Sequence, residues 1–163
     1  IQVDAFGAAQ MTQTSTSSTL YEQDFNLWIE DTVNKLKAHQ FDEVDLDKLI
    51  EEIQALARRD RRELESRLRV LFAHLLKRVY VKSPDNFRGW EITIREQRNE
   101  LRILLKQSPS LKEYLLELWN EVWQIAIAEV QEDYSKTEFP RICPFPQDLE
   151  FLLTQRFWED QHS

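Results

Sequence analysis

Glycine is nearly absent from this chain of 163 residues, which has only two, at positions 7 and 89. The prolines lie at five positions, Pro84, Pro109, Pro140, Pro144 and Pro146. Because glycine and proline most often interrupt regular structure, long stretches of the chain run without a break. Those stretches repeat apolar residues every three to four positions, which is the spacing of one face of a helix. The sequence therefore predicts an all-α fold, and no segment shows the alternating pattern of a strand.

Four main helices are expected, over residues 19–39, 45–80, 90–106 and 110–134. Hydroxyl and carboxylate pairs that form capping boxes mark two of the helix starts, Thr19 with Glu22 and Ser110 with Glu113. Asp45 is the expected N-cap of the second helix. The segment Lys82–Asn86 contains turn-forming residues and is expected to be a turn before the third helix.

The second of these helices is unusually long. Unbroken, it would have about 35 residues and a length of roughly 50 Å. This exceeds what a compact domain of this size accommodates. Either the helix bends near Asp60, where Arg58–Arg62 interrupts the apolar stripe, or half of it leaves the bundle to meet a partner.

The C-terminal part of the chain has a different character. Residues 139–146 contain three prolines and cannot be helical, so an extended segment is expected there. A short helix over about 147–154 and the aromatic pair Phe157–Trp158 follow. The predicted architecture is thus an antiparallel bundle of about four main helices, with a short C-terminal helix and an extended Pro-rich strap that closes the core.

The expected organisation is a disordered leader over residues 1–18, one helical domain over 19–158, and a tail over 159–163. Residues 1–10 look vector-derived, with Met11 as the native start, although a real start further upstream is the alternative. No run of 18 apolar residues occurs, so no membrane span is expected. The single cysteine, Cys143, excludes an intrachain disulfide and fits a reducing cytoplasm.

Charge is segregated along the chain. Residues 58–106 hold 14 Lys/Arg against 7 Asp/Glu, whereas the whole chain has a net charge of −8. The densest part holds six arginines within twelve residues, and five of them form the candidate interaction surface, Arg58, Arg59, Arg61, Arg62 and Arg69. Three interpretations are open: a solvated face paired with neighbouring carboxylates, a surface for a protein partner, or a nucleic-acid interface through residues 58–106.

The composition excludes several kinds of chemistry. Phosphate-binding loops need several glycines, and the single glycine after residue 7 rules them out. Three scattered histidines and one cysteine do not give a zinc-ligand spacing. Glu159–His162 is the one Glu-x-x-His pair and falls in the tail, so a di-iron bundle is not expected either. The chain is therefore expected to hold no cofactor and no metal.

Two residues within the helices stand out. His74 lies in an apolar run and is either a partly buried histidine bonded to a carbonyl or carboxylate, or an acid/base group paired with Glu96. Arg98 falls inside the apolar pattern of the third helix, and a buried Arg98 with a carboxylate partner is expected to fix the packing register.

A spaced set of motifs resembles a known family. The motifs are Leu71–Lys77, Trp90–Arg98 and Ser108–Leu111, together with Tyr21–Phe25, Trp28, Phe139–Pro140 and Cys143–Pro144. They resemble the bacterial, mainly cyanobacterial, domain of unknown function, family twenty-nine, over about residues 21–158. The resemblance implies a compact all-helical fold and no established activity. Positions that recur in this motif set, without an assigned role, are His74, Lys77, Trp90, Glu96, Gln97 and Arg98.

The function expected from the sequence is that of a non-enzymatic cytoplasmic protein that binds another protein or a second copy of itself. Nucleic-acid binding through residues 58–106 is the second hypothesis, and an enzyme centred on His74 and Glu96 is the third. The arginine segment, the overlong helix and the absence of catalytic residue sets favour the first.

Overall fold

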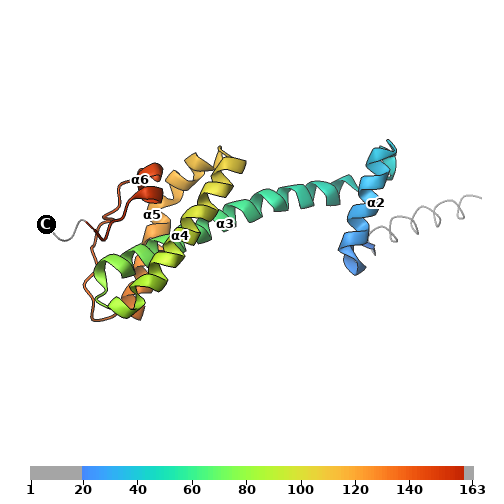
Figure 1. Ribbon diagram of the computed structural model, residues 1–163. Helices are drawn as coiled ribbons and strands as arrows, with labels where there is room; N and C mark the ends of the chain where they lie inside the picture. The colour runs from blue at the N-terminus through green and yellow to red at the C-terminus, as the bar shows by residue number, and fades with distance from the viewer. Residues whose placement is uncertain (1–19, 160–163) are drawn as a thin grey trace, which may run out of the picture. The chain divides into compact units, whose positions relative to one another are not determined.

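The computed structural model describes residues 20–159 and confirms the all-α class, because every regular element in that range is helical. The elements are α2 (Phe25–Lys37), η1 (Phe41–Glu43), α3 (Leu46–Tyr80), α4 (Pro84–Gln107), α5 (Leu111–Asp133) and α6 (Leu149–Thr154) (Figure 1). The predicted leader over residues 1–18, Thr19 and residues 160–163 of the predicted tail lie outside the described residues. The described chain falls into two compact units that meet within α3, between Leu56 and Ala57. The prediction of one domain over 19–158 stays a prediction.

The N-terminal unit, residues 20–56, is a helical hairpin of α2 and the first part of α3. Helix α2 begins at Phe25 because Asp24 has an extended backbone and its side chain accepts a hydrogen bond from the Leu27 amide at 3.0 Å. Residues 20–23 are helical as well, so Asp24 interrupts the single helix predicted over 19–39, and the predicted start at Thr19 lies outside the described residues. The helix ends where predicted, since His39 takes a left-handed backbone with φ of 58°.

Helix α3 begins as predicted and runs on without interruption. The Asp45 side chain accepts a hydrogen bond from the Lys48 amide at 3.2 Å, so Asp45 caps the helix start. The helix then covers 35 residues, from Leu46 to Tyr80, and stays helical through Asp60. The helix therefore has the length that the sequence gives it when unbroken, and Arg58–Arg62 does not end it.

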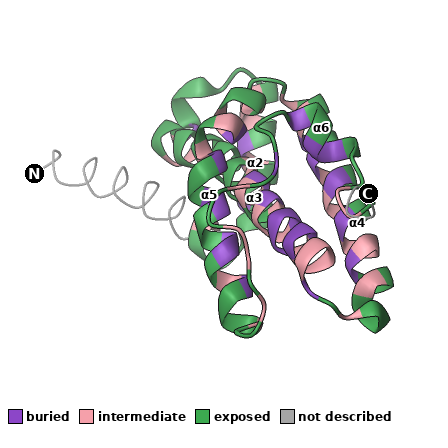
Figure 2. Ribbon diagram, turned by 90° about the vertical axis from the view of Figure 1, so that its left-hand side faces the viewer, coloured by how far each residue is buried: buried purple, intermediate pink, exposed green. Residues whose placement is uncertain are grey.

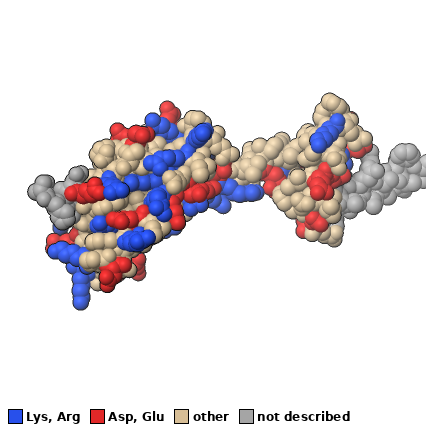
Figure 3. Space-filling view, viewed as in Figure 1, with Lys and Arg blue, Asp and Glu red and all other residues tan. Residues whose placement is uncertain are grey.

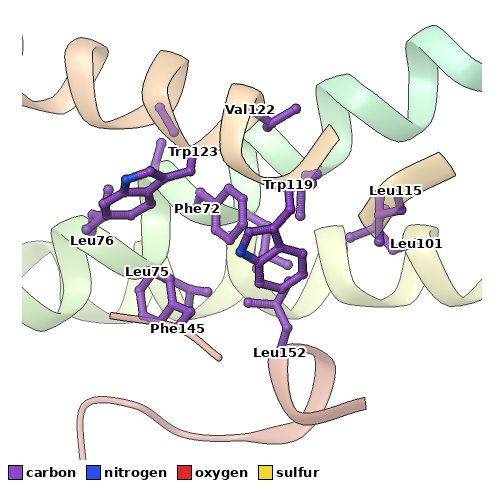
Figure 4. Packing of buried hydrophobic residues seen from close by; sticks show 14 of the residues in the cluster. Phe72, Leu75, Leu76, Leu101, Leu115, Trp119, Val122, Trp123, Phe145 and Leu152 are labelled. Atoms are coloured by element: carbon purple, nitrogen blue, oxygen red, sulfur yellow. The ribbon is translucent and has the colours of Figure 1, made fainter. Parts of the chain in front are cut away.

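The C-terminal unit, residues 57–159, contains the main core. Connections of three residues join α3 to α4 and α4 to α5, so neighbouring helices run antiparallel. In Figure 2, buried residues line the sides of these helices that face one another. The Phe72 ring from α3 lies edge-on to Trp119 of α5, with centroids 5.1 Å apart, and stacks against Phe145 at 6.0 Å (Figure 4). Aromatic pairs of this kind add to the stabilisation from burial alone.

Two predicted helix starts differ from the structure. Helix α4 begins at Pro84, not Trp90, so Pro84–Asn86 of the predicted turn lie in its first turn. Proline is favoured at the first helical position because its missing amide proton would have no partner there. Ser110 precedes α5 as predicted, but its side chain makes no capping hydrogen bond. The capping box with Glu113 was therefore wrong.

The Pro-rich strap is confirmed. Residues 139–146 form no helix, and they carry Phe145, which is 4% exposed, into the core beside Phe72 and Trp123. Helix α6 follows, and Asp148 caps it by accepting a hydrogen bond from the Phe151 amide at 3.1 Å. The strap and α6 thus close one side of the α3–α5 bundle, as Figure 4 shows for Phe145 and Leu152.

Candidate interaction surface

The N-terminal hairpin leaves much of its apolar surface uncovered. Of the thirteen large apolar side chains that are exposed in residues 20–159, nine lie between Phe25 and Leu56. Seven of these form what we call the hairpin face, namely Phe25, Ile29, Val33, Leu46, Ile50, Ile53 and Leu56. On α3 they are 51–57% exposed, which is unusual for a set of adjacent isoleucine and leucine side chains.

The exposed residues of α3 follow a regular spacing. Leu46, Ile50 and Ile53 are separated by four and three positions, so they lie on one side of the helix. Ala57 continues the series four positions later. Such a stripe is the pattern by which a helix packs against another helix.

The hairpin has almost no core of its own. Only Trp28, Thr32 and Val44 are buried in residues 20–56. Tyr21, which precedes α2, contacts both segments. Its ring lies edge-on to Trp28 and 4.9 Å from the Lys48 ammonium, and its hydroxyl donates to the Glu52 carboxylate. A unit of this size usually needs a disulfide, a metal or an additional protein surface to be stable. The hairpin face is where such a surface would pack.

The predicted arginine surface lies at the start of the C-terminal unit and is partly paired. Arg58, Arg59, Arg61 and Arg62 are exposed. The Arg61 guanidinium lies 5.4 Å from the centre of the Tyr114 ring. Arg69 is half-buried and forms an ion pair with Glu129 of α5 at 2.5 Å.

A shallow hollow of about 330 Å³ lies between α3 and α5 within this unit. Two of the predicted arginines line it, Arg62 and Arg69, and Val122 and Ile125 give it an apolar part. Glu65 and Glu129 line it as well, so the charges of the arginines are locally balanced. The hollow offers mixed polar and apolar contacts and no concentrated positive charge.

The C-terminal unit as a whole is nearly neutral, although residues 58–106 are basic. Residues 57–159 hold 18 Lys/Arg and 17 Asp/Glu, whereas residues 20–56 hold 3 Lys/Arg and 10 Asp/Glu. Figure 3 shows Lys and Arg interspersed with Asp and Glu over the visible face of residues 57–159. Arg67 lies 3.4 Å from Glu63, and Arg78 lies 2.8 Å from Glu91. Much of the predicted basic character is therefore offset by carboxylates of the same unit.

Three of the family motif positions, Trp90, Gln97 and Lys77, lie beside residues of neighbouring segments. Trp90 is 8% exposed and lies edge-on to Tyr134. The Gln97 side chain accepts a hydrogen bond from Arg67 at 3.4 Å. Burial lowers the pKa of the Lys77 ammonium, while Asp133 and Glu129 act in the opposite direction. These positions tie α3, α4 and α5 together.

Arg98 is buried, as predicted, but its partners are not carboxylates. Its Nε donates to the Leu152 carbonyl at 3.0 Å, and its NH2 group donates to the Gln155 carbonyl at 2.5 Å. Arg102 donates to the Leu153 carbonyl at 2.5 Å. The last carbonyls of a helix lack partners within it and carry partial negative charge, so two arginines of α4 complete the end of α6. Burial, with Arg102 nearby, lowers the pKa of Arg98 to about 10.

The predicted pair of His74 and Glu96 is not formed. In residues 20–159 the structure has no hydrogen bond between the two side chains, and Glu96 is exposed on α4. The Nδ1 atom of His74 lies 2.8 Å from the Val70 carbonyl, one turn earlier in α3. This matches the alternative of a partly buried histidine bonded to a carbonyl.

Burial makes His74 a source of pH dependence. Removal from water lowers its pKa below the ordinary 6.5, although the bond to Val70 acts in the opposite direction. Between the folded-state pKa and 6.5, the unfolded chain binds more protons than the folded chain. Stability should therefore fall as the pH drops through that window. We expect His74→Asn to remove part of this pH dependence in urea unfolding measured between about pH 7 and pH 5.

The exposed His39 provides the control for this prediction. His39→Asn suits the left-handed backbone at that position and makes the same substitution at an exposed histidine. Equal slopes for the His74 and His39 variants would contradict the assignment.

Other chemistry finds little support in the described part of the chain. Cys143 is half-buried, and burial raises the pKa of its thiol, which disfavours the reactive thiolate. Within residues 20–159, no group of three His, Cys, Asp or Glu side chains is placed to hold a metal ion. Over the same range, the helices lack the combined length and apolar character needed to cross a membrane.

The sequence indicates the apolar residues of the hairpin by their helical spacing but does not indicate what covers them. The residues themselves are helical and correctly spaced, yet nothing within residues 20–56 covers them. The available signal was the overlong second helix, for which a partner was one of two explanations. The concentration of acidic residues beside these apolar positions was a further signal.

The comparisons with known proteins give one result. The family model described as "Domain of unknown function DUF29" matches residues 20–158 of the chain. No curated protein and no solved structure matches the chain.

Proposed function

We propose that this chain, which belongs to the DUF29 family of domains of unknown function, acts by protein–protein association through the hairpin face. The family description supplies no activity, so the proposal rests on the residues. The observation that carries it is the exposure of Leu46, Ile50 and Ile53 at 51–57% on one side of α3. Association would remove this apolar surface from water, which is the main driving force of most protein complexes.

The small core of the hairpin supports the proposal. Three buried side chains in residues 20–56 provide too little burial to fix two helical segments. The single cysteine excludes an intrachain disulfide. A protein surface is the remaining means of stabilisation among those common in units this small. A cytoplasmic location, inferred from cysteine usage, is part of the same proposal.

Nucleic-acid binding through residues 58–106 has weaker support. Arg67, Arg69 and Arg78 form ion pairs with carboxylates, and Arg98 is committed to the end of α6. These side chains are not free to neutralise phosphates. An enzymatic role for His74 and Glu96 has less support still, because the structure does not bring the two together.

The proposal is tested with Ile50→Glu/Ile53→Glu. Two charges on the hairpin face should raise the dissociation constant of the complex by at least about 100-fold, because each buried isoleucine contributes about 1.5–3 kcal/mol. The readouts are the native mass of the purified chain and capture of partners by the immobilised chain. Helix content should remain at the wild-type level, since both positions are exposed.

The control is Ile103→Glu/Ile125→Glu, which adds the same charge at exposed isoleucines of the C-terminal unit. It should assemble like the wild type. A wild-type chain that is monomeric and captures nothing would overturn the proposal, as would equal behaviour of the two double variants.

A further inference from the structure

Acidic, apolar and basic residues follow one another in that order over residues 42–62, from just before α3 into its first part. Residues 42–47 contain four acidic residues and no basic one. The apolar stripe Leu46, Ile50, Ile53 and Ala57 comes next. Residues 58–62 then contain four arginines and one aspartate. The stripe thus has an acidic segment before it and a basic segment after it.

This order makes the segment complementary to itself when reversed. Two copies of α3 that run antiparallel can place Ile50 opposite Ile53 and Leu46 opposite Ala57, so each apolar position meets another. In the same register, the residue before the stripe, Asp45, lies opposite the residue after it, Arg58. The acidic segment of each copy then lies beside the basic segment of the other.

We propose that the occupant of the hairpin face is a second copy of this chain, with the two α3 helices packed antiparallel along residues 46–62 and the acidic residues 42–45 of each copy beside the arginines of the other. This inference rests on the proposed association through the hairpin face. The interface is isologous, meaning that each contact occurs twice about a two-fold axis. It also gives Arg58, Arg61 and Arg62 a role beyond the C-terminal unit.

The charge order favours this arrangement over a parallel pair. In a parallel pair, the two acidic segments would lie together and so would the two arginine segments, and like charges at close range oppose association. The antiparallel register replaces both repulsions with attractions. Ile29 and Val33 of α2 would then extend the apolar contact toward a four-helix arrangement of two hairpins.

The arrangement is tested by reversing one charge at a time at Asp42 and Arg61, which the register places at the same level of the dimer. One variant is Asp42→Lys, at an exposed residue that precedes α3. The other is Arg61→Glu, at an exposed arginine. In an antiparallel dimer, each variant alone brings like charges together, so the dissociation constant should rise by about tenfold or more. In a parallel dimer, each variant only exchanges one like-charge contact for another, and the constant should hardly change.

Combining the changes completes the test. The chain with both substitutions has the charges of this pair exchanged, so its dimer should return to within about threefold of the wild-type affinity. A mixture of the two single variants should form the heterodimer in preference to either homodimer, because Lys then meets Glu at one end and Asp meets Arg at the other. Sedimentation equilibrium across a wide concentration range measures all of these species.

The outcomes distinguish this inference from the function on which it rests. If the two single charge reversals dimerise like the wild type, or the variant that combines them does not recover, the antiparallel dimer is overturned. If Ile50→Glu/Ile53→Glu still abolishes assembly in that case, association through the hairpin face stands. A wild-type chain that stays monomeric at about 100 µM overturns the dimer, and the capture experiment then decides the proposed function separately.

Discussion

Replacing Phe72 with alanine is expected to lower the free energy of unfolding by about 3–5 kcal/mol. The Phe72 side chain is 0% exposed, and its ring contacts Trp119, Trp123 and Phe145. These contacts come from α5 and the strap, so one truncation loosens the packing of α3 against both. The cavity cannot collapse easily, because large aromatic rings surround it on several sides. Urea unfolding followed by circular dichroism measures the effect.

Phe151→Ala is the matched control for this prediction. It removes the same group from a ring that is 37% exposed and contacts Phe157. The expected loss is about 1 kcal/mol. Equal losses for Phe72 and Phe151 would show that the aromatic cluster is not the centre of the core.

Arg98→Ala is expected to destabilise the protein by about 2–4 kcal/mol, since hydrogen bonds to a charged group contribute about 1.5–3 kcal/mol each. The loss of the bonds to Leu152 and Gln155 leaves carbonyls at the end of α6 without protein donors. Relief from burying the guanidinium offsets part of this loss. Arg98→Lys should recover only a fraction, because one ammonium cannot reproduce the planar fork that reaches both carbonyls.

Hydrogen exchange identifies the segment that Arg98→Ala destabilises. In Arg98→Ala, amides of residues 149–157 should exchange faster than those of α5, because the arginine holds α6 against α4. Arg95→Ala, an exposed change one turn earlier on α4, should alter stability by less than about 0.5 kcal/mol. An Arg98 variant as stable as the Arg95 variant would contradict the assignment of Arg98 to the end of α6.

Local chemistry made the helices predictable. Apolar spacing and the scarcity of glycine gave the all-α class, and Asp45 and the proline-rich segment marked real boundaries. The errors arose where one residue type serves two purposes. Pro84 can form a turn or begin a helix, and here it begins α4. Asp24 lies within an apolar pattern that continues on both sides, yet its side chain caps α2.

The contacts that these side chains make were harder to predict than their burial or their side of the helix. The apolar pattern around Arg98 correctly indicated burial. The guanidinium donates to backbone carbonyls at the end of α6, and because every residue has a carbonyl, the sequence does not indicate which ones accept. The apolar stripe of α3 raised the same difficulty. Its spacing shows that Leu46, Ile50 and Ile53 share one side of a helix, while the element that covers them depends on tertiary or quaternary structure.

The most direct test of the account is the native mass of the purified chain across a range of concentrations, by sedimentation equilibrium. The account predicts a wild-type dimer, a monomeric Ile50→Glu/Ile53→Glu variant with unchanged helix content, and a dimeric Ile103→Glu/Ile125→Glu control. A monomeric wild type, or a dimer that survives charges at Ile50 and Ile53, would contradict self-association through the hairpin face.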